Sequence, residues 1–243
     1  QGTCSGATAV GGRTGLGTPA VVVGTRAVGL MGGRDEFLYG TTEDGGSHGD
    51  GTLFRLNKDG SNFTVLYNFD CVPGGTPFGA PTEGPDGALY GVTNPVPTDY
   101  PSCQNGNVYR FDKNTMTMTS VATLNAVATG TDMYGSPVLG GDLSIYGTTQ
   151  SASSPPYDLG TVFKISPITG WSPLHIFSGP DGSYPAAGLV RGPDGTMYGT
   201  TQAGGAFDGG TIFSITEDGI FNVLFSFNPS SPNLFDPTYV PMF

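Results

Sequence analysis

A short pattern recurs four times along this chain, and such self-similarity restricts the fold more than any other feature of the sequence. Each copy has an aliphatic residue followed by Tyr-Gly, with tyrosines 51, 56 and 52 residues apart. A second pattern, Gly-Thr-Val-Phe or a close variant, follows each copy. Successive copies of this second pattern begin 55, 54 and 50 residues apart. The tyrosines are Tyr39, Tyr90, Tyr146 and Tyr198, and the glycines that open the second pattern are Gly51, Gly106, Gly160 and Gly210.

Each unit predicts four short β-strands. β-Branched and aromatic residues alternate with smaller ones between turns rich in Gly, Pro and Asp. In the last unit the expected strands are 186–190, 196–201, 211–215 and 221–227. Four antiparallel strands per unit are typical of a β-propeller blade, so we expect an all-β fold. The 41 Gly and 20 Pro among 243 residues exclude a helical bundle.

The two ends of the chain predict a fifth blade that they share. A shift of 193 residues places residues 5–23 on the second and third strands of the last unit. Residues 236–242 match the first strand of that unit. We therefore expect one five-bladed domain over residues 1–243, closed by a blade of residues 1–24 and 235–243, with the other blades at about 25–69, 70–124, 125–178 and 179–234. Four repeats with irregular tails are the alternative.

The patterns resemble the GloVer-type tandem repeat of secreted proteins, which is close to LYGTT, then GG, then GTVF. Residues 38–54 and 197–213 carry this resemblance most fully. It implies an extracellular propeller and no particular chemistry. The second unit departs from the pattern, because Val92 replaces a Thr and residues 94–103 replace the glycine loop. We expect that loop to be specialised.

Several weak features favour a secreted, extracellular protein. The chain begins at Gln1, as it would after removal of a signal peptide, and Asn62 lies in a glycosylation sequon. Its three cysteines include no metal-binding or redox spacing. Cys71 and Cys103 are expected in neighbouring loops, where a disulfide would stabilise the fold by about 3–4 kcal/mol. Cys4 would then be a buried free thiol.

The charge balance excludes two classes of partner. The chain has 9 Lys and Arg against 20 Asp and Glu, which gives a net charge of −11. This charge opposes binding to nucleic acid or to an anionic membrane surface. The apolar runs are far shorter than the roughly 20 residues that span a bilayer, so membrane insertion is not expected. We expect a monomer.

The strand order separates two faces of the predicted propeller. Connections from second to third strands and from blade to blade are long and share one face, which we call the loop-rich face. The hairpins on the opposite side, the turn face, are short. Long loops on a rigid scaffold normally carry binding residues, so the loop-rich face is expected to hold the site.

The start of each innermost strand faces the central channel at the loop-rich face. Aromatic rings there can stack on sugar rings, and charged groups can bind hydroxyls. The substrate-binding candidates are Arg13, Arg26, His48, Asp70, Phe78, Tyr134 and Tyr184. Asp132 and Asp236 occupy equivalent places in different blades and are candidates for a catalytic acid–base pair, one of them with a raised pKa. The alternative is that these two aspartates only cap strand ends.

No cofactor is expected, and a metal site has little support. Asp44, His48 and Asp50 are weak candidates because their loop lacks the ligand spacing of an EF-hand, although a structural calcium ion is an open alternative. We interpret His175 and the four repeated tyrosines as packing residues. Glycine pairs in the loops lack the helix and lysine of a phosphate-binding loop.

Together these features favour glycan recognition at the loop-rich face. A glycoside hydrolase is preferred slightly over a non-catalytic, lectin-like glycan-binding module, because the candidate polar groups are not repeated in every blade. A polysaccharide lyase is less favoured, since the net charge opposes an anionic substrate. An extracellular protein-interaction scaffold is the third alternative.

Overall fold

A computed structural model describes residues 24–70, 75–94, 105–124, 133–151, 158–166 and 169–230. Over these residues the fold is all-β, with sixteen strands in four antiparallel sheets of four strands each. Each sheet takes its strands from one repeat unit, as the sequence predicts. The described residues contain no helix that could cross a membrane.

The strands follow chain order within each sheet. The first sheet contains β1 (Thr25–Gly32), β2 (Phe37–Asp44), β3 (Thr52–Asn57) and β4 (Thr64–Asn68). The second contains β5 (Thr76–Glu83), β6 (Leu89–Asn94), β7 (Gly106–Asp112) and β8 (Thr117–Leu124). The third contains β9 (Val138–Leu139), β10 (Ile145–Thr149), β11 (Thr161–Ser166) and β12 (Gly170–Ile176). The fourth contains β13 (Val190–Arg191), β14 (Met197–Thr200), β15 (Thr211–Ile215) and β16 (Phe221–Ser226).

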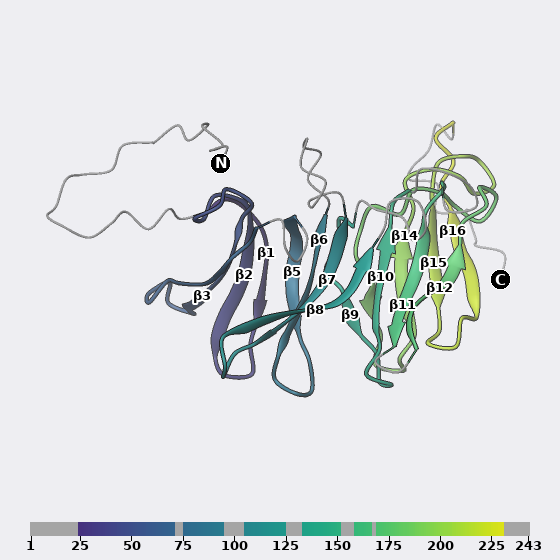
Figure 1. The fold of residues 1–243 in the computed structure, drawn as a ribbon. Coiled ribbons are helices and arrows are strands. Elements are labelled where there is room, and N and C mark those ends of the chain that lie inside the picture. Colours follow the sequence, from purple (N-terminus) through teal and green to yellow (C-terminus); the bar gives the residue numbers. More distant parts are fainter. Residues whose placement is uncertain are drawn as a thin grey trace, which may run out of the picture.

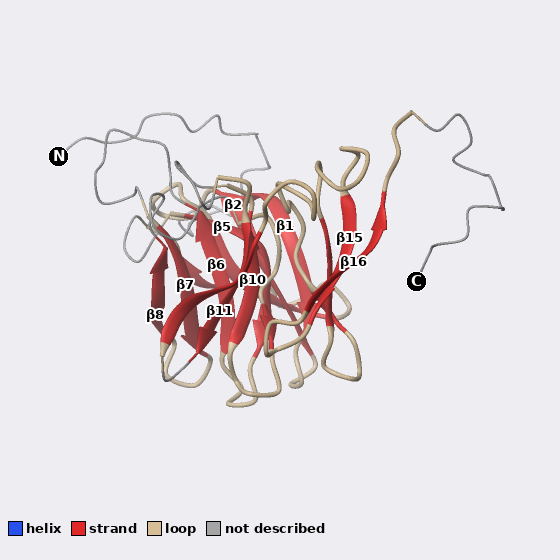
Figure 2. Ribbon diagram, turned by 90° about the vertical axis from the view of Figure 1, so that its right-hand side faces the viewer, coloured by secondary structure: helices blue, strands red, loops and turns tan. Residues whose placement is uncertain are grey.

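Figure 1 shows the four sheets side by side in chain order, with the first and fourth sheets at opposite ends of the row. The innermost strand β5 lies against β1 and β2 of the preceding sheet. In Figure 2 the strands run between two faces, and the loop-rich face is at the top. Strand β1 begins and β16 ends at this face.

The two repeated patterns are linked because an aromatic ring covers the glycine of Tyr-Gly. Gly147 on β10 pairs with Phe163 on β11, and a Cβ at Gly147 would lie only 2.5 Å from Cζ of the Phe163 ring. Gly199 and Phe213 repeat this arrangement in the fourth sheet, at 2.4 Å. Only glycine leaves room for the ring, so both patterns recur together.

The hydrophobic core lies between the sheets. Each of its three clusters combines residues of two adjacent sheets. In the first, Tyr39 and Leu53 of one sheet contact Leu89 and Phe111 of the next. Tyr39 is 1% exposed, and Tyr146 holds the equivalent place in another cluster. This confirms for both tyrosines that they pack between blades, and it means that each sheet depends on its neighbours for burial.

A threonine after the Tyr-Gly pattern joins neighbouring sheets. The Thr41 hydroxyl donates to the Gly79 carbonyl of the second sheet at 2.8 Å. The Thr148 hydroxyl donates to the Ala187 carbonyl of the fourth sheet at 2.9 Å. Val92 occupies this position in the second sheet and cannot donate, so its side chain joins the apolar core instead.

The next threonine forms a cross-strand pair within its own sheet. Thr149 and Thr161 share a buried hydroxyl hydrogen bond of 2.8 Å, and Thr42 and Thr52 in the first sheet share one of 2.9 Å. In the second sheet Asn107 replaces the second threonine of the pair. The buried Thr93 hydroxyl consequently lacks a hydrogen-bond partner among the described residues.

The innermost strand of the fourth sheet is shorter than the sequence predicts, and that of the third sheet is equally short. The strand expected over 186–190 is only β13, Val190–Arg191. Before it, the Ala187 carbonyl bonds to the preceding sheet instead of to β14. A Cβ at Gly135 would lie 1.9 Å from the Gly188 nitrogen, so the backbones of the two sheets meet there. In the residues before β13, contact with the preceding sheet thus replaces the strand pairing with β14 that the sequence predicts.

Replacement of Gly147 by Ala is expected to lower the free energy of unfolding by about 2–3 kcal/mol, because the new methyl group must displace the buried Phe163 ring. Chemical denaturation of the purified variant measures this loss. Gly32→Ala is the matched control, since a Cβ there meets no atom within 4 Å, and its effect should stay within about 0.5 kcal/mol. Equal stability of the two variants would contradict the proposed role of the ring.

Candidate ligand-binding site at the loop-rich face

Phe78 and Tyr134 form an aromatic pair between the second and third sheets. Each lies 12 residues before the repeated tyrosine of its unit, so the two positions are equivalent. Their ring centroids are 5.3 Å apart at an interplanar angle of 86°, an edge-to-face arrangement. Tyr134 is 41% exposed. The structure therefore brings together two of the predicted binding residues and leaves an aromatic surface open to a ligand.

Arg26 lies on the innermost strand of the first sheet and is held by acidic neighbours. Its guanidinium is 2.9 Å from a Glu43 carboxylate oxygen and 3.9 Å from one of Asp44. Two-thirds of the side chain is exposed, and the backbone has a φ of 59°, which a residue with a Cβ adopts at a cost. Arg26 thus presents a charged donor group at the edge of the face.

Tyr184 also has a left-handed backbone, with a φ of 57°. Its amide donates to the Leu159 carbonyl at 2.8 Å, and its carbonyl accepts from the Gln202 amide at 3.2 Å. The first bond ties the fourth unit to the third sheet, and the second lies within the fourth unit. Together they hold this conformation. The Tyr184 side chain is 38% exposed.

A polar residue lies at or just beyond the end of the second strand of every described sheet, and sequence analysis did not identify it. Glu43 binds Arg26, and Asn94 accepts a hydrogen bond of 2.8 Å from the Met133 amide of the next sheet. Gln150 donates to Gln202 of the next sheet at 3.1 Å. We call Glu43, Asn94, Gln150 and Gln202 the polar row. Its signal in the sequence is the position four residues after each repeated tyrosine.

His48, Asp50 and Asp70 belong to one end of the loop-rich face. Burial raises the pKa of Asp50, the Asp70 charge raises it further, and His48 partly offsets both effects. His48 is exposed, with its Nδ1 3.2 Å from the Ser47 hydroxyl. Across the described ranges, no three His, Cys, Asp or Glu residues are placed to hold a metal ion, so Asp44, His48 and Asp50 form no ligand set there.

Several predicted residues lie outside the described residues: Arg13, Asp132, Asp236, Cys4, Cys71 and Cys103. Asn62 is described and exposed, in the hairpin between β3 and β4 with a φ of 55°. His175 packs as predicted, because its ring stacks on Phe221 at 3.6 Å. It also pairs with Asp181 at 2.8 Å, a contact that the sequence did not indicate.

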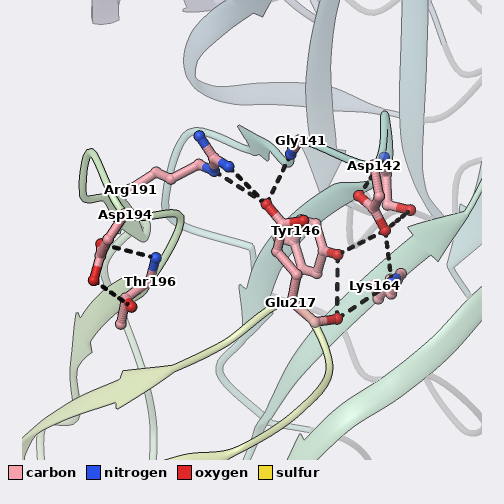
Figure 3. Close-up of polar contacts among 9 residues, drawn as sticks. Gly141, Asp142, Tyr146, Lys164, Arg191, Asp194, Thr196 and Glu217 are labelled. Atoms are coloured by element: carbon pink, nitrogen blue, oxygen red, sulfur yellow. Dashed lines mark hydrogen bonds and ion pairs between the residues drawn. The ribbon is translucent and has the colours of Figure 1, made fainter.

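A dense polar network lies on the turn face, where it joins the third and fourth sheets (Figure 3). Glu217 of the fourth sheet accepts a hydrogen bond of 2.7 Å from the Gly141 amide of the third and pairs with Arg191 at 2.8 Å. A shallow pocket of about 220 Å³ borders these groups. Because Glu217 and Arg191 neutralise each other, the network serves as a contact between sheets.

Asp142 and Lys164 complete this network. Their charged atoms are 2.7 Å apart, and the Tyr146 hydroxyl donates to the same carboxylate at 3.1 Å (Figure 3). Burial acts to raise the Asp142 pKa, but the hydrogen bonds from Lys164, Ser144 and Tyr146 outweigh it and lower the pKa to about 2. A carboxyl so firmly ionised stabilises the fold and is unsuited to donating a proton near neutral pH.

Three similar solved structures have propeller-like folds. TolB from Acinetobacter baumannii has a TM-score of 0.55 and 16% identity, over 82% of this chain and 43% of that one. A gluconolactonase from Xanthomonas campestris has a TM-score of 0.53 and 16% identity, over 81% of this chain and 60% of that one. For an oligogalacturonate lyase from Vibrio parahaemolyticus the values are 0.52 and 16%, over 85% of this chain and 54% of that one.

This chain therefore spans about half the length of these structures, and at such low identity the likeness shows the fold alone. No curated protein matches the sequence significantly. The model of the Gloeobacter/Verrucomicrobia repeat matches residues 97–238, more than half of the chain. This agrees with the tandem-repeat resemblance and with the repeated strands and glycines described above. The chain belongs to the Gloeobacter/Verrucomicrobia repeat family.

Proposed function

We propose that this protein is secreted and binds a glycan at the loop-rich face, in the mouth of a five-bladed ring. The observation that carries the proposal is the edge-to-face pair of Phe78 and Tyr134, in which Tyr134 is 41% exposed and Phe78 is half-buried. Aromatic rings that are open to solvent offer the apolar faces of sugars a surface to stack on. The five-bladed ring belongs to the proposal, because a channel has a mouth only where the sheets close around it.

Polar side chains elsewhere on the loop-rich face offer the hydrogen bonds that sugar hydroxyls need. Gln150 and Gln202 have both donor and acceptor groups, and Arg26 offers donors beside the Glu43 acceptor. A few polar groups around an aromatic surface are the usual composition of a small-ligand site. This combination favours a glycan over a wholly apolar ligand.

The charge on this face favours a neutral glycan. Among the described residues, Arg26 is the one Lys or Arg on the loop-rich face, whereas Glu43, Asp50, Asp70 and Asp158 all carry carboxylates there. The other described cations belong to the turn face. A surface with this excess of negative charge repels polyanionic sugars. The gluconolactonase and the oligogalacturonate lyase among the similar structures are compatible with sugar as the ligand class.

Cleavage of the bound glycan by Asp132 and Asp236 is the second candidate function. A glycosidase needs one carboxyl with a raised pKa, and burial beside another acid is the usual cause. On this face, burial and the charge of Asp70 both raise the pKa of Asp50. The same environment at Asp132 or Asp236 would suit a general acid.

Replacement of Phe78 or Tyr134 by Ala should weaken glycan binding about 10-fold or more, because each change removes one ring of the stacking surface. Calorimetry with a panel of neutral oligosaccharides measures this effect. Phe63→Ala is the matched control, since Phe63 is 41% exposed in a hairpin on the turn face. The binding proposal is wrong if the native protein retains no neutral glycan, or if the control weakens binding equally.

If the protein cleaves the glycan, Asp132→Asn and Asp236→Asn should each reduce product release at least about a hundredfold, since each removes a proton-transfer group. Asp59→Asn, in an exposed turn-face hairpin, should leave the rate unchanged. Reducing-end release from the bound glycan is the measurement. Unchanged rates in both variants would remove these aspartates from the mechanism, and binding without products would place the protein in the lectin-like class.

A further inference from the structure

Each repeat unit places an aspartate four residues before its repeated tyrosine, in the turn that leads into the second strand. The four aspartates are Asp35, Asp86, Asp142 and Asp194. A glycine two residues earlier lies against both groups: a Cβ at Gly140 would be 2.7 Å from Oδ1 of Asp142 and 2.5 Å from Cε2 of Tyr146. In the fourth sheet the equivalent atoms lie 2.8 and 3.3 Å from a Cβ at Gly192. The turn face therefore repeats one arrangement of a carboxylate beside a ring edge.

In the first three sheets a basic side chain of the protein itself occupies this arrangement. The Lys164 ammonium nitrogen is 2.7 Å from an Asp142 carboxylate oxygen and 5.4 Å from the centroid of the Tyr146 ring (Figure 3). Lys113 repeats this at the first sheet, 2.7 Å from the carboxylate and 5.0 Å from the ring centroid. Arg110 pairs with the carboxylate of the second sheet at 2.8 Å. The arrangement thus binds cations by combining an ion pair with attraction to an aromatic ring.

The fourth sheet keeps the carboxylate and the ring but not the basic residue. Ser214 pairs with Tyr198 across β14 and β15, at the position that Lys164 holds in the third sheet. Asp194 accepts hydrogen bonds from the Thr196 amide at 3.1 Å and the Thr196 hydroxyl at 2.9 Å (Figure 3). It forms no ion pair with any of the residues that the structure describes. The fourth sheet therefore supplies no cation to its own carboxylate.

Few other basic side chains of this chain could take that place. Eight of its nine Lys and Arg residues are described, and Arg191, which borders the same pocket as Asp194, is engaged by Glu217 at 2.8 Å. The ninth, Arg13, aligns with Ala206 and is expected on the loop-rich face. A basic group for this carboxylate is therefore expected from another molecule.

The surface around Asp194 suits a positively charged group. The pocket of about 220 Å³ carries the carboxylates of Asp194 and Glu217 against the guanidinium of Arg191. Thr196 and Thr216 also line it, and an ammonium group has three N–H donors to share among such oxygens. Hydrogen bonds from the Thr196 hydroxyl and amide lower the pKa of Asp194, so it and an alkylamine are both charged near neutral pH.

The equivalent carboxylates stay accessible even where a further sheet follows. The side chains of Asp35, Asp86 and Asp142 are 38%, 38% and 36% exposed, although another described sheet packs against each of their sheets. A fifth sheet after the fourth would accordingly leave Asp194 within reach of a ligand.

We propose that Asp194 and Tyr198 form a binding site for a primary alkylammonium group, of the kind that a lysine side chain carries. The ammonium nitrogen binds the Asp194 carboxylate beside the Tyr198 ring, as Lys164 does within the third sheet. Lys113 shows that the cation can come from a separate element, because it reaches the first sheet from the second. The inference does not depend on glycan binding, which is proposed on the opposite face.

The test is an NMR titration of the isotope-labelled native protein with N-acetyl-lysine methylamide. The amides of residues 194–198 and 214 should shift and saturate. N-acetyl-norleucine methylamide, which has an aliphatic side chain without the ammonium, should leave them unshifted. Butylamine carries the ammonium without a peptide: tighter binding of the lysine derivative identifies a polypeptide as the source, and binding that is no tighter identifies a free amine. The proposal is wrong if neither amine shifts these amides, or if the norleucine derivative shifts them equally.

Asp194→Asn should weaken binding of the lysine derivative about five-fold or more, because a neutral amide forms no ion pair with an ammonium group. Asp59→Asn is the matched control. Asp59 accepts the same amide and hydroxyl hydrogen bonds, from Ser61, and its replacement removes one charge from the turn face of the first sheet. Equal weakening by the two variants would show a general effect of charge and overturn the assignment of the site.

Ser214→Lys supplies the basic residue that the fourth sheet lacks. Its ammonium should occupy the site as Lys164 does in the third sheet, and a tethered group competes at high effective concentration. Binding of the lysine derivative should therefore weaken about 10-fold or more, whereas Ser214→Gln, which adds length without charge, should weaken it less. Equal affinities of the Ser214→Lys variant and the native protein would contradict the proposal.

Discussion

Burial between neighbouring sheets is the constraint on which the rest of this structure depends. Each core cluster combines two sheets, so no sheet buries its apolar residues alone. Glycine under an aromatic ring, as at Gly147 and Phe163, lets the strands present that aromatic to the preceding sheet. The threonine hydroxyls then join neighbouring backbones, as Thr148 does with Ala187. Repetition of these few contacts explains why the sequence repeats them too.

The two faces of the protein divide its chemistry. On the turn face, charges are matched within each sheet, as in the pairs of Glu217 with Arg191 and Asp142 with Lys164. Such matched groups stabilise the assembly and leave little capacity for a ligand. On the loop-rich face, the Tyr134 ring of the Phe78 pair is exposed, and carboxylates outnumber cations among the residues that the structure describes. The proposed binding surface therefore lies where the strands end and the long loops begin.

The sequence predicted the strands well because its glycines, tyrosines and threonines have structural roles that recur in several units. It also placed Phe78 and Tyr134 near the central channel, and the structure brings their ring centroids to 5.3 Å of each other. It did not reveal the polar row, because a residue such as Gln150 after the second threonine reads as the start of a loop. The short inner strand β13 was also missed, because contact between Gly135 and Gly188 depends on how the sheets approach each other.

The claim that each sheet is stabilised by neighbours on both sides is tested most directly by hydrogen exchange of the native protein. If the fourth sheet is covered, amides in β14 and β15 will exchange as slowly as those in β10 and β11, which are covered in the described structure. If β14 and β15 exchange 100-fold faster or more, the outer face of the fourth sheet is uncovered in solution, and the account of a closed ring is contradicted.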